Sequence, residues 1–266
     1  MNVSAATNLG PNLDPSAPRS PPGCFVTGTD TEVGKTRISA ALLHWMARHG
    51  LATVGFKPVA AGTTLIDGRR VNEDVQLLRA ASSVTVTDAE VGPFQFDAAC
   101  APHVAAALEG RVIDLAAILA AGRALQARSD FIVVEGVGGF CVPLGPDWDS
   151  SQIARGFALP VVLVIGLRLG CLNHALLTVE AIKARHLPLA GWIANTVDPD
   201  MAHLQHNLAT LRHALDVRQQ VPCLGLIPRL DDPRPSAVAA HLDDAAMRLA
   251  FGLRGLAAPA VPPLCP

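Results

Sequence analysis

Short, nearly continuous runs of apolar residues recur along the chain, and each is followed by a loop and then by a helical pattern. Strands that are covered by helices on both faces are apolar on both faces, so such runs predict the buried strands of a parallel sheet. We expect these strands at Cys24–Thr27, Thr53–Lys57, Phe131–Glu135, Val161–Gly166, Gly191–Asn195 and Leu224–Pro228.

Between the expected strands, apolar residues recur with the period of amphipathic helices. The clearest helices are expected at Thr36–His49, Ile113–Arg128, Asn173–Arg185 and Ala202–Leu215. The segment 61–101 is the least regular. It is expected to hold a helix near Glu73–Ala81, and another is expected after Pro102, because proline suits the first helical position. Alternating strands and helices predict a single α/β domain with a mostly parallel sheet and helices on both faces.

The two ends of the chain lack this pattern. Residues 1–22 are rich in Pro, Ser and Asn and are expected to form a disordered tail. The domain is expected to span residues 23–250, and residues 251–266 are expected to be a C-terminal tail. The segment AVAAHLDDAAMRLAFGL, residues 237–253, could pack on the body or on a partner subunit, and the sequence does not decide between them.

Composition narrows the classes of partner. The formal net charge of −2 gives no electrostatic attraction to nucleic acid or to an anionic membrane. No apolar stretch is long enough to span a bilayer, and the N-terminus lacks the pattern of a secretory signal. The six cysteines form no C-x-x-C pair, so they are expected to be core residues in a reducing compartment. We therefore expect a cytoplasmic protein with no nucleic-acid or membrane partner.

The stretch Thr27–Thr36, TGTDTEVGKT, joins the first expected strand to the first expected helix. Its last three residues are typical of a phosphate-binding P-loop, in which backbone N–H groups at a helix N-terminus point at the anion. Lys35 would reach the β- and γ-phosphates, and the Thr36 hydroxyl would bind Mg²⁺. The usual pattern is G-x-x-x-x-G-K-[ST], and here Thr29 stands at its first glycine. A chance G-K-T in a turn is the alternative, and the flanking strand and helix argue against it.

Charged residues at other expected strand ends would face the same crevice, because ligands bind at the carboxyl ends of parallel strands. Glu135 ends the run FIVVEG, where a carboxylate could reach Mg²⁺; an ordinary strand-ending carboxylate is the alternative. Lys57 in GFKPVAAG could offer a second positive charge to a reacting anion, and snorkelling into solvent is its alternative. Asp74 in NEDVQLL, taken alone, is more typical of a helix start.

These pieces together resemble the dethiobiotin synthetase family, over about Gly23 to Leu230. They occur in the family's order and at similar spacing, and GTDTEVGKT and LGCLNHALLT are highly specific. The segments that carry the resemblance are FVTGTDTEVGKT, GFKPVAAG, NEDVQLL, APHVAAALEG, VVEGVGGFCVPL, LPVVLVIGLRLGCLNHALLTVEAIK, LAGWIANTVDP and LGLIPRL.

The resemblance implies a Mg·ATP-dependent cyclo-ligase of biotin synthesis. In that reaction 7,8-diaminopelargonate takes up CO2 as a carbamate, and ATP phosphorylates the carbamate to a carbamic–phosphoric anhydride. The neighbouring amine then closes the cyclic urea of dethiobiotin, and ADP and phosphate are released. Two anions, the carbamate and the γ-phosphate, must be brought together, and Lys35, Lys57 and Mg²⁺ would screen their repulsion.

The resemblance also assigns nucleotide-binding residues by position. Thr36, Asp74 and Glu135 would hold magnesium. Asn195 would contact the adenine edge, and the residues from Ile227 to Arg229 would flank the base. The full set implied for ATP is Thr31, Glu32, Val33, Gly34, Lys35, Thr36, Arg37, Asp74, Glu135, Gly136, Val137, Gly138, Asn195, Thr196, Ile227, Pro228 and Arg229.

For the substrate, the resemblance implies a homodimer with its site near the interface. The block Leu169–Asn173 would reach across that interface to the carboxylate tail of the partner's substrate, and a helix N-terminus is suited to hold a carboxylate. Lys57 and Lys35 would be the catalytic residues. The residues implied for the substrate are Lys57, Ala61, Gly138, Gly170, Cys171, Leu172 and Asn173.

Three positions depart from the commonest family pattern. Ala61 stands where a substrate-contacting serine is usual, so one hydrogen bond is lost or moves to Thr63. Thr196 replaces a frequent aspartate, and Arg229 replaces a frequent tryptophan near the base. A guanidinium group can also stack on an aromatic ring.

Two other P-loop classes remain as alternatives. A switch or partitioning ATPase usually carries an additional lysine near the start of the loop, and TGTDTEV has none. An ATP-dependent amide-forming enzyme of the cobyrinate type would be followed by an amidotransferase domain, which the sequence does not contain.

Overall fold

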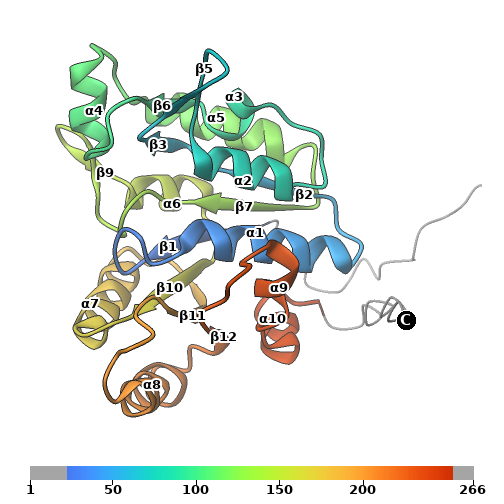
Figure 1. The fold of residues 1–266 in the computed structure, drawn as a ribbon, viewed down its shortest axis with the longest axis vertical. Coiled ribbons are helices and arrows are strands. Elements are labelled where there is room, and N and C mark those ends of the chain that lie inside the picture. Colours follow the sequence, from blue (N-terminus) through green and yellow to red (C-terminus); the bar gives the residue numbers. More distant parts are fainter. Residues whose placement is uncertain (1–22, 254–266) are drawn as a thin grey trace, which may run out of the picture.

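The centre of the molecule is a six-stranded sheet with the strand order β12-β11-β10-β1-β7-β2, in which all neighbouring strands are parallel (Figure 1). The computed structural model describes residues 23–253, so the expected tail at residues 1–22 and residues 254–266 lie outside the described residues. The strands are β1 (Gly23–Gly28), β2 (Thr53–Phe56), β7 (Phe131–Glu135), β10 (Val161–Leu167), β11 (Leu189–Thr196) and β12 (Cys223–Ile227). All six strands that the sequence predicts are confirmed, with small shifts at their ends.

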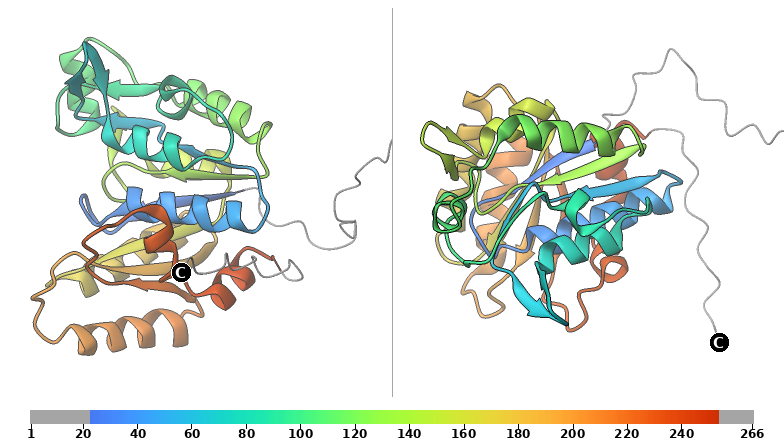
Figure 2. Two further views of the ribbon diagram at one scale, coloured as in Figure 1. Left: turned by 45° about the vertical axis from the view of Figure 1, so that its right-hand side comes forward. Right: turned by 90° about the horizontal axis from the view of Figure 1, so that it is seen from above.

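Helices cover both faces of this sheet, as predicted (Figure 2). One face carries α1 (Lys35–Arg48), α2 (Glu73–Ala81) and α9 (Pro235–Ala239). The other carries α5 (Leu115–Gln126), α6 (Ser151–Phe157), α7 (Cys171–Ala184) and α8 (Leu204–Arg212). α10 (Asp244–Ala250) packs on β12 at the edge. Within residues 23–253, no helix is both long and apolar enough to cross a membrane.

The helix predicted at Ala202–Leu215 differs most from its expected form. It begins only at Leu204, because His203 has a left-handed backbone with φ 57°. It then continues as a π-helical turn, η1 (His213–Val217). This turn places Asp216 so that its Oδ1 accepts a hydrogen bond of 2.6 Å from the indole Nε1 of buried Trp192.

The irregular segment after β2 forms small elements that surround one end of the sheet. β3 (Val59–Ala61) pairs in parallel with β6 (Phe94–Phe96), and β4 (Thr64–Ile66) forms a hairpin with β5 (Arg69–Val71). These strands have three residues each, too few for a period to show, and the sequence did not predict them. The remaining short elements are α3 (Asp88–Val91), α4 (Pro102–Leu108), β8 (Pro143–Gly145) and β9 (Trp148–Asp149).

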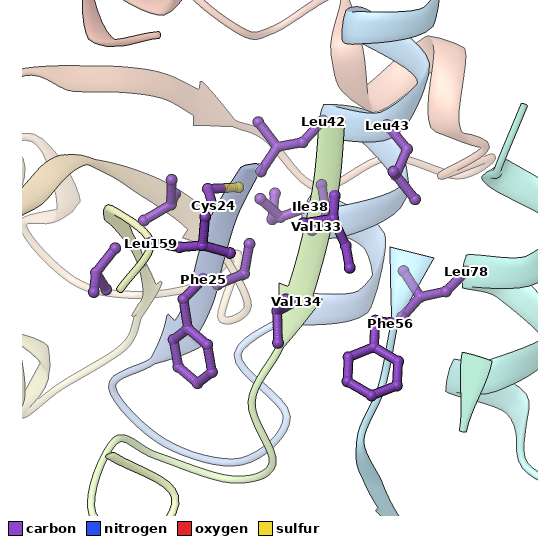
Figure 3. Close-up of a cluster of buried hydrophobic side chains, with 14 of the residues drawn as sticks. Cys24, Phe25, Ile38, Leu42, Leu43, Phe56, Leu78, Val133, Val134 and Leu159 are labelled. Carbon is purple, nitrogen blue, oxygen red and sulfur yellow. The ribbon is translucent and has the colours of Figure 1, made fainter. Parts of the chain in front are cut away.

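The main buried cluster packs α1 on one face of the central strands and α5 and α6 on the other. Figure 3 shows Ile38, Leu42 and Leu43 of α1 beside Cys24 of β1 and Val133 of β7, and all five side chains are buried. A second buried cluster joins β10 and β11 to α7 and α8. Together the two clusters fix the relative positions of the strands whose carboxyl ends carry the predicted site.

The packed body extends beyond the expected domain end at residue 250. Phe251 is fully buried, and its ring meets Phe131 of β7 edge-on with centroids 5.4 Å apart. Leu253 is also buried. These contacts place residues 251–253 against the same core as the central sheet.

Candidate active site

A cavity of about 1290 Å³ lies at the carboxyl ends of the parallel strands. It collects residues from segments that are far apart in the sequence, which is what the strand-end rule predicts. The predicted site residues that line it are Thr31, Glu32, Gly34, Lys35, Thr36, Arg37, Lys57, Ala61, Asp74, Val137, Gly138, Asn195, Thr196, Ile227, Pro228 and Arg229.

The loop between β1 and α1 has the backbone that a phosphate site requires. Gly34 caps α1 with φ 90°, and a Cβ at this position would lie 2.3 Å from Nδ2 of Asn195, so only glycine fits. No side chain among residues 23–253 caps α1, and the first turn of this helix carries no acidic residue. The N–H groups at this helix end therefore point toward the cavity without a competing carboxylate, and the helix dipole favours an anion there.

Lys35 lies at the start of α1 and is almost fully buried. Its Nζ donates a hydrogen bond of 2.9 Å to the backbone oxygen of Asp30, so the side chain folds back over the loop. Burial, and then the neighbouring Lys57 ammonium, lower the pKa of Lys35 to about 8. An ammonium with so little solvation gains more from an incoming phosphate than an exposed lysine does.

Lys57 follows β2 and is 3% exposed, so the alternative of an ammonium that snorkels into solvent is wrong. Its Nζ lies 2.5 Å from Oε1 of Glu135 and 2.8 Å from Oδ2 of Asp74. Burial acts to lower the pKa of Lys57, but the charges and hydrogen bonds of Glu135 and Asp74 outweigh it and raise the pKa above its usual value. Lys57 is therefore charged, and it lines the same cavity as Lys35.

Thr36, Asp74 and Glu135 meet beside Lys57. The Thr36 hydroxyl oxygen lies 2.7 Å from Oδ1 of Asp74 and 2.8 Å from Oε1 of Glu135. Burial acts to raise the pKa of Asp74, but the Lys57 charge and hydrogen bond outweigh it and hold that pKa below its usual value. Asp74 lies in the first turn of α2. It is therefore both a helix-start residue and a member of this cluster, and the two interpretations of this residue are compatible.

Oxygen ligands for a hard cation are present in this cluster. Glu135 is fully buried, and among the described residues its Oε2 has no hydrogen-bond partner. A buried carboxylate oxygen without a partner is costly, and a cation or its water would satisfy it. Two carboxylates and a hydroxyl are the oxygen donors that Mg²⁺ takes beside a nucleotide. The residues present therefore fit a magnesium ion.

The far end of the cavity is formed by β11 and β12, where Asn195 and Ile227 are register partners. The Nδ2 of Asn195 donates a hydrogen bond of 2.9 Å to the backbone oxygen of Val33. This bond ties the predicted base end of the cavity to the phosphate loop. Val33 itself is buried and does not line the cavity, so its part is structural.

Residues 23–236 match a family described as an AAA domain. The chain is 53% identical over 220 residues to the ATP-dependent dethiobiotin synthetase BioD of Ralstonia nicotianae, an alignment that covers 83% of this chain and 94% of that protein. It is 50% identical over 222 residues to the protein of the same name from Aromatoleum aromaticum, with 84% and 97% covered. The chain belongs to the dethiobiotin synthetase family.

A solved structure with a similar chain trace is the septum site-determining protein MinD of Pyrococcus horikoshii, complexed with Mg-ADP. The TM-score is 0.49 at 15% identity, and the alignment covers 88% of this chain and 97% of that one. A similarity at this level carries no argument about the activity of this chain.

Four of the residues implied for the substrate of a dethiobiotin synthetase do not line the cavity. They are Gly170, Cys171, Leu172 and Asn173, at the start of α7. Glu135 and Gly136 also lie outside the lining, but both contact Lys57. The backbone oxygen of Gly136 lies 3.4 Å from the Nζ of Lys57. Among the described residues, the α7 block is therefore a predicted part of the site that does not line the cavity.

Several cavity residues were missed by the sequence reasoning. Asp97 follows β6 and lines the cavity beside Ala61, and its Oδ1 accepts a hydrogen bond of 2.7 Å from the hydroxyl of Thr63. A strand-ending carboxylate in FQFDAAC is the same signal that selected Glu135, but β6 was too short to be recognised. Because the Thr63 hydrogen is held by Asp97, Thr63 can offer a ligand only its acceptor lone pairs in this arrangement.

Proposed function

We infer that this protein is an ATP-dependent dethiobiotin synthetase, a cyclo-ligase of biotin synthesis. It would convert 7,8-diaminopelargonate, CO2 and ATP to dethiobiotin, ADP and phosphate. The observation that carries this proposal is that Lys35 and Lys57, which come from different strand ends, line one cavity in a chain of this family. Two cationic groups at one cavity suit a reaction in which two anions must meet.

In the proposed reaction, the loop Thr31–Arg37 binds the phosphates of ATP. The uncapped N–H groups of α1 donate hydrogen bonds to phosphate oxygens. Lys35 turns from the Asp30 carbonyl to the β- and γ-phosphates. Gly136, Val137 and Gly138 border the same phosphates, and Gly138 also borders the substrate. The base lies between Asn195, Thr196 and the segment Ile227, Pro228 and Arg229, and the position of these five residues in the cavity lining supports this placement.

Lys57 has the central role in the proposed chemistry. Its ammonium faces the carbamate of the substrate and screens the repulsion between that carbamate and the γ-phosphate. The amine next to the carbamate then attacks the anhydride carbon, and phosphate leaves. No covalent enzyme intermediate is needed, so positioning and charge are the contributions of the protein.

Thr36, Asp74 and Glu135 would hold the magnesium ion of Mg·ATP. A metal at this position supplies charge that neutralises the phosphate oxygens. In the structure both carboxylates are paired with Lys57. If a bound metal shared the charge of Asp74 and Glu135, the Lys57 ammonium would be less compensated and better able to contact the carbamate.

We propose that the working unit is a homodimer, in which the start of α7 completes the site of its partner. Gly170 caps α7 with φ 94°, no side chain in the described part of the chain caps the helix, and its first turn lacks acidic residues. These features suit the carboxylate tail of the substrate. Leu169 is 91% exposed on the described chain, which fits a turn that meets another subunit.

The proposed reaction is tested by measuring phosphate release from ATP with each substrate omitted in turn. Release should require the diamine and bicarbonate together, and mass spectrometry should find dethiobiotin in equal amount. Steady hydrolysis without the diamine, or stimulation only by a protein or DNA partner, would instead indicate a switch ATPase.

The dimer is tested separately by mixing two inactive variants, Lys57→Ala and Asn173→Asp. The first lacks the cavity lysine, and the second places a negative charge where the carboxylate would bind. Mixed dimers would contain one intact composite site, so activity should partly return after subunit exchange. Failure of the mixture to regain activity, with exchange verified by tagged chains, would contradict the shared site.

A further inference from the structure

Asp30 and Arg168 form an ion pair between the phosphate loop and the turn that starts α7. The Nη2 of Arg168 lies against Oδ2 of Asp30, and the central strands β2, β7 and β10 lie between the two residues in the sequence. The side chain of Arg168 is 40% exposed and that of Asp30 is 46% exposed. An ion pair with this exposure contributes little to stability, so its position is more informative than its strength.

Asp30 holds the phosphate loop through two further contacts. Its Oδ1 accepts a hydrogen bond of 2.7 Å from the backbone N–H of Thr31, and its own backbone oxygen accepts the 2.9 Å bond from Lys35. Directly after Thr31, Glu32 has a left-handed backbone with φ 56°, a conformation that costs free energy in a residue other than glycine. The orientation of Asp30 therefore fixes both the loop shape and the resting position of the Lys35 ammonium.

Arg168 lies in the turn between β10 and α7. It directly follows β10, and its backbone oxygen accepts a hydrogen bond of 3.0 Å from the N–H of Cys171, the first residue of α7. The turn between them contains Gly170, with its φ of 94°. Arg168 is thus part of the turn that leads to the uncapped N-terminus of α7, while its side chain reaches back to the phosphate loop.

We propose that Arg168 is a positioning residue, which acts through Asp30 to hold the phosphate loop in the form that receives ATP. This proposal rests on the proposed function for the identity of the nucleotide. Without the guanidinium group, the Asp30 carboxylate loses its cationic partner and the loop can relax away from the strained conformation at Glu32. The nucleotide must then reorder the loop when it binds, and its affinity falls by the cost of that ordering.

The test measures the affinity of a non-hydrolysable ATP analogue with magnesium by calorimetry for Arg168→Ala, Arg168→Lys and Asp30→Asn. We expect Arg168→Ala and Asp30→Asn each to weaken binding by about two- to fivefold, the range that matches the small contribution of an exposed ion pair. Arg168→Lys, which keeps the charge, should recover part of the loss. Because the two residues act through one contact, the double variant should bind no more weakly than the worse single variant.

The chain offers a matched control in Arg128, whose Nη1 lies 2.5 Å from Oε1 of Glu90 with side-chain exposures of 47% and 38%. Arg128 does not line the cavity, so Arg128→Ala should leave the affinity of the analogue unchanged. Equal affinity in Arg168→Ala and the wild type, or additive losses in the double variant, would overturn the proposal. Thermal melting identifies any variant that fails to fold, in which case Arg168→Lys and Asp30→Asn decide the question.

Analogue binding does not depend on the ligase reaction, so this outcome is separate from that of the proposed function. If the wild-type protein bound the analogue but formed no dethiobiotin, the proposed function would fail while the role of Arg168 remained measurable. If dethiobiotin formed and Arg168→Ala bound the analogue normally, only the positioning role would fail.

Discussion

The Nζ of Lys57 lies 2.5 Å from Oε1 of Glu135, and both side chains are buried at the ends of the adjacent strands β2 and β7. A buried charge pair is weak support for stability, but removal of one member leaves the other charge uncompensated. The lysine proposed for the chemistry is therefore also part of the structure that holds the proposed metal ligands. Substitutions here will change stability and turnover together, and the two effects have to be measured separately.

Lys57→Ala is expected to lower turnover by about 10²–10³-fold, the usual loss when one charge-stabilising group is removed. It should also destabilise the fold by about 3–5 kcal/mol, because Glu135 stays buried without its cation. Binding of ATP through the phosphate loop should persist. Steady-state kinetics, urea denaturation and calorimetry measure the three effects, and substantial surviving turnover would remove Lys57 from the mechanism.

Thr36→Ala is expected to raise the magnesium concentration needed for half-maximal rate by roughly ten- to a hundredfold, as loss of a group in a metal site does. The hydroxyl oxygen lies 2.7 Å from Asp74 and 2.8 Å from Glu135, so its loss removes one oxygen of the proposed set. Thr36→Ser keeps the hydroxyl and serves as the control. Rates are measured over a magnesium titration at fixed ATP, and identical curves for Thr36→Ala and the wild type would exclude Thr36 as a ligand.

The central strands and the phosphate loop were predictable because their signals are local. An apolar run of strand length, or G-K-T between a strand and a helix, needs no knowledge of its neighbours in space. The pairing of Lys57 with Glu135 was not predictable from the residues in this way. It depends on β7 lying next to β2, although β3, β4, β5 and β6 separate the two strands in the sequence.

Other parts of the site depend on contacts that no short pattern carries. Asp97 reaches the cavity only because β6 pairs with β3, and each of those strands has three residues. In the sequence, Arg168 is an ordinary charged residue after a strand, and only the structure shows its contact with Asp30. Phe251 lies in a segment that reads as a tail, and its burial depends on the ring of Phe131.

Phe251→Ala is expected to lower the free energy of unfolding by about 3–5 kcal/mol, because it removes a fully buried ring from the core. Turnover below the melting temperature should stay near that of the wild type, since Phe251 does not line the cavity. The variant therefore also serves as a stability-matched control for Lys57→Ala. Leu249, which is 55% exposed on α10, provides the local comparison, and Leu249→Ala should change stability little. Equal urea midpoints for the two variants would contradict the packing of residue 251.

Glu90→Gln is expected to lower the melting temperature at neutral pH by an amount that vanishes in acid. Hydrogen bonds from the Thr87 backbone and from Arg128 lower the pKa of Glu90 from its ordinary value of 4.5 to about 2. The unfolded chain therefore binds this proton first as the pH falls, so the stabilisation is complete above 4.5 and is lost as the pH falls toward 2.

Melting temperatures of the wild type and Glu90→Gln, measured by calorimetry from neutral pH down to the acid limit of folding, check this expectation. Subtracting the two series removes the acid sensitivity that both proteins share. Glu180, which is exposed on α7, supplies a matched substitution, and Glu180→Gln should give a small difference at every pH. A Glu90→Gln difference that stays constant into the acid range would show that the carboxylate charge does not stabilise the start of α3, and that only its size and polarity matter there.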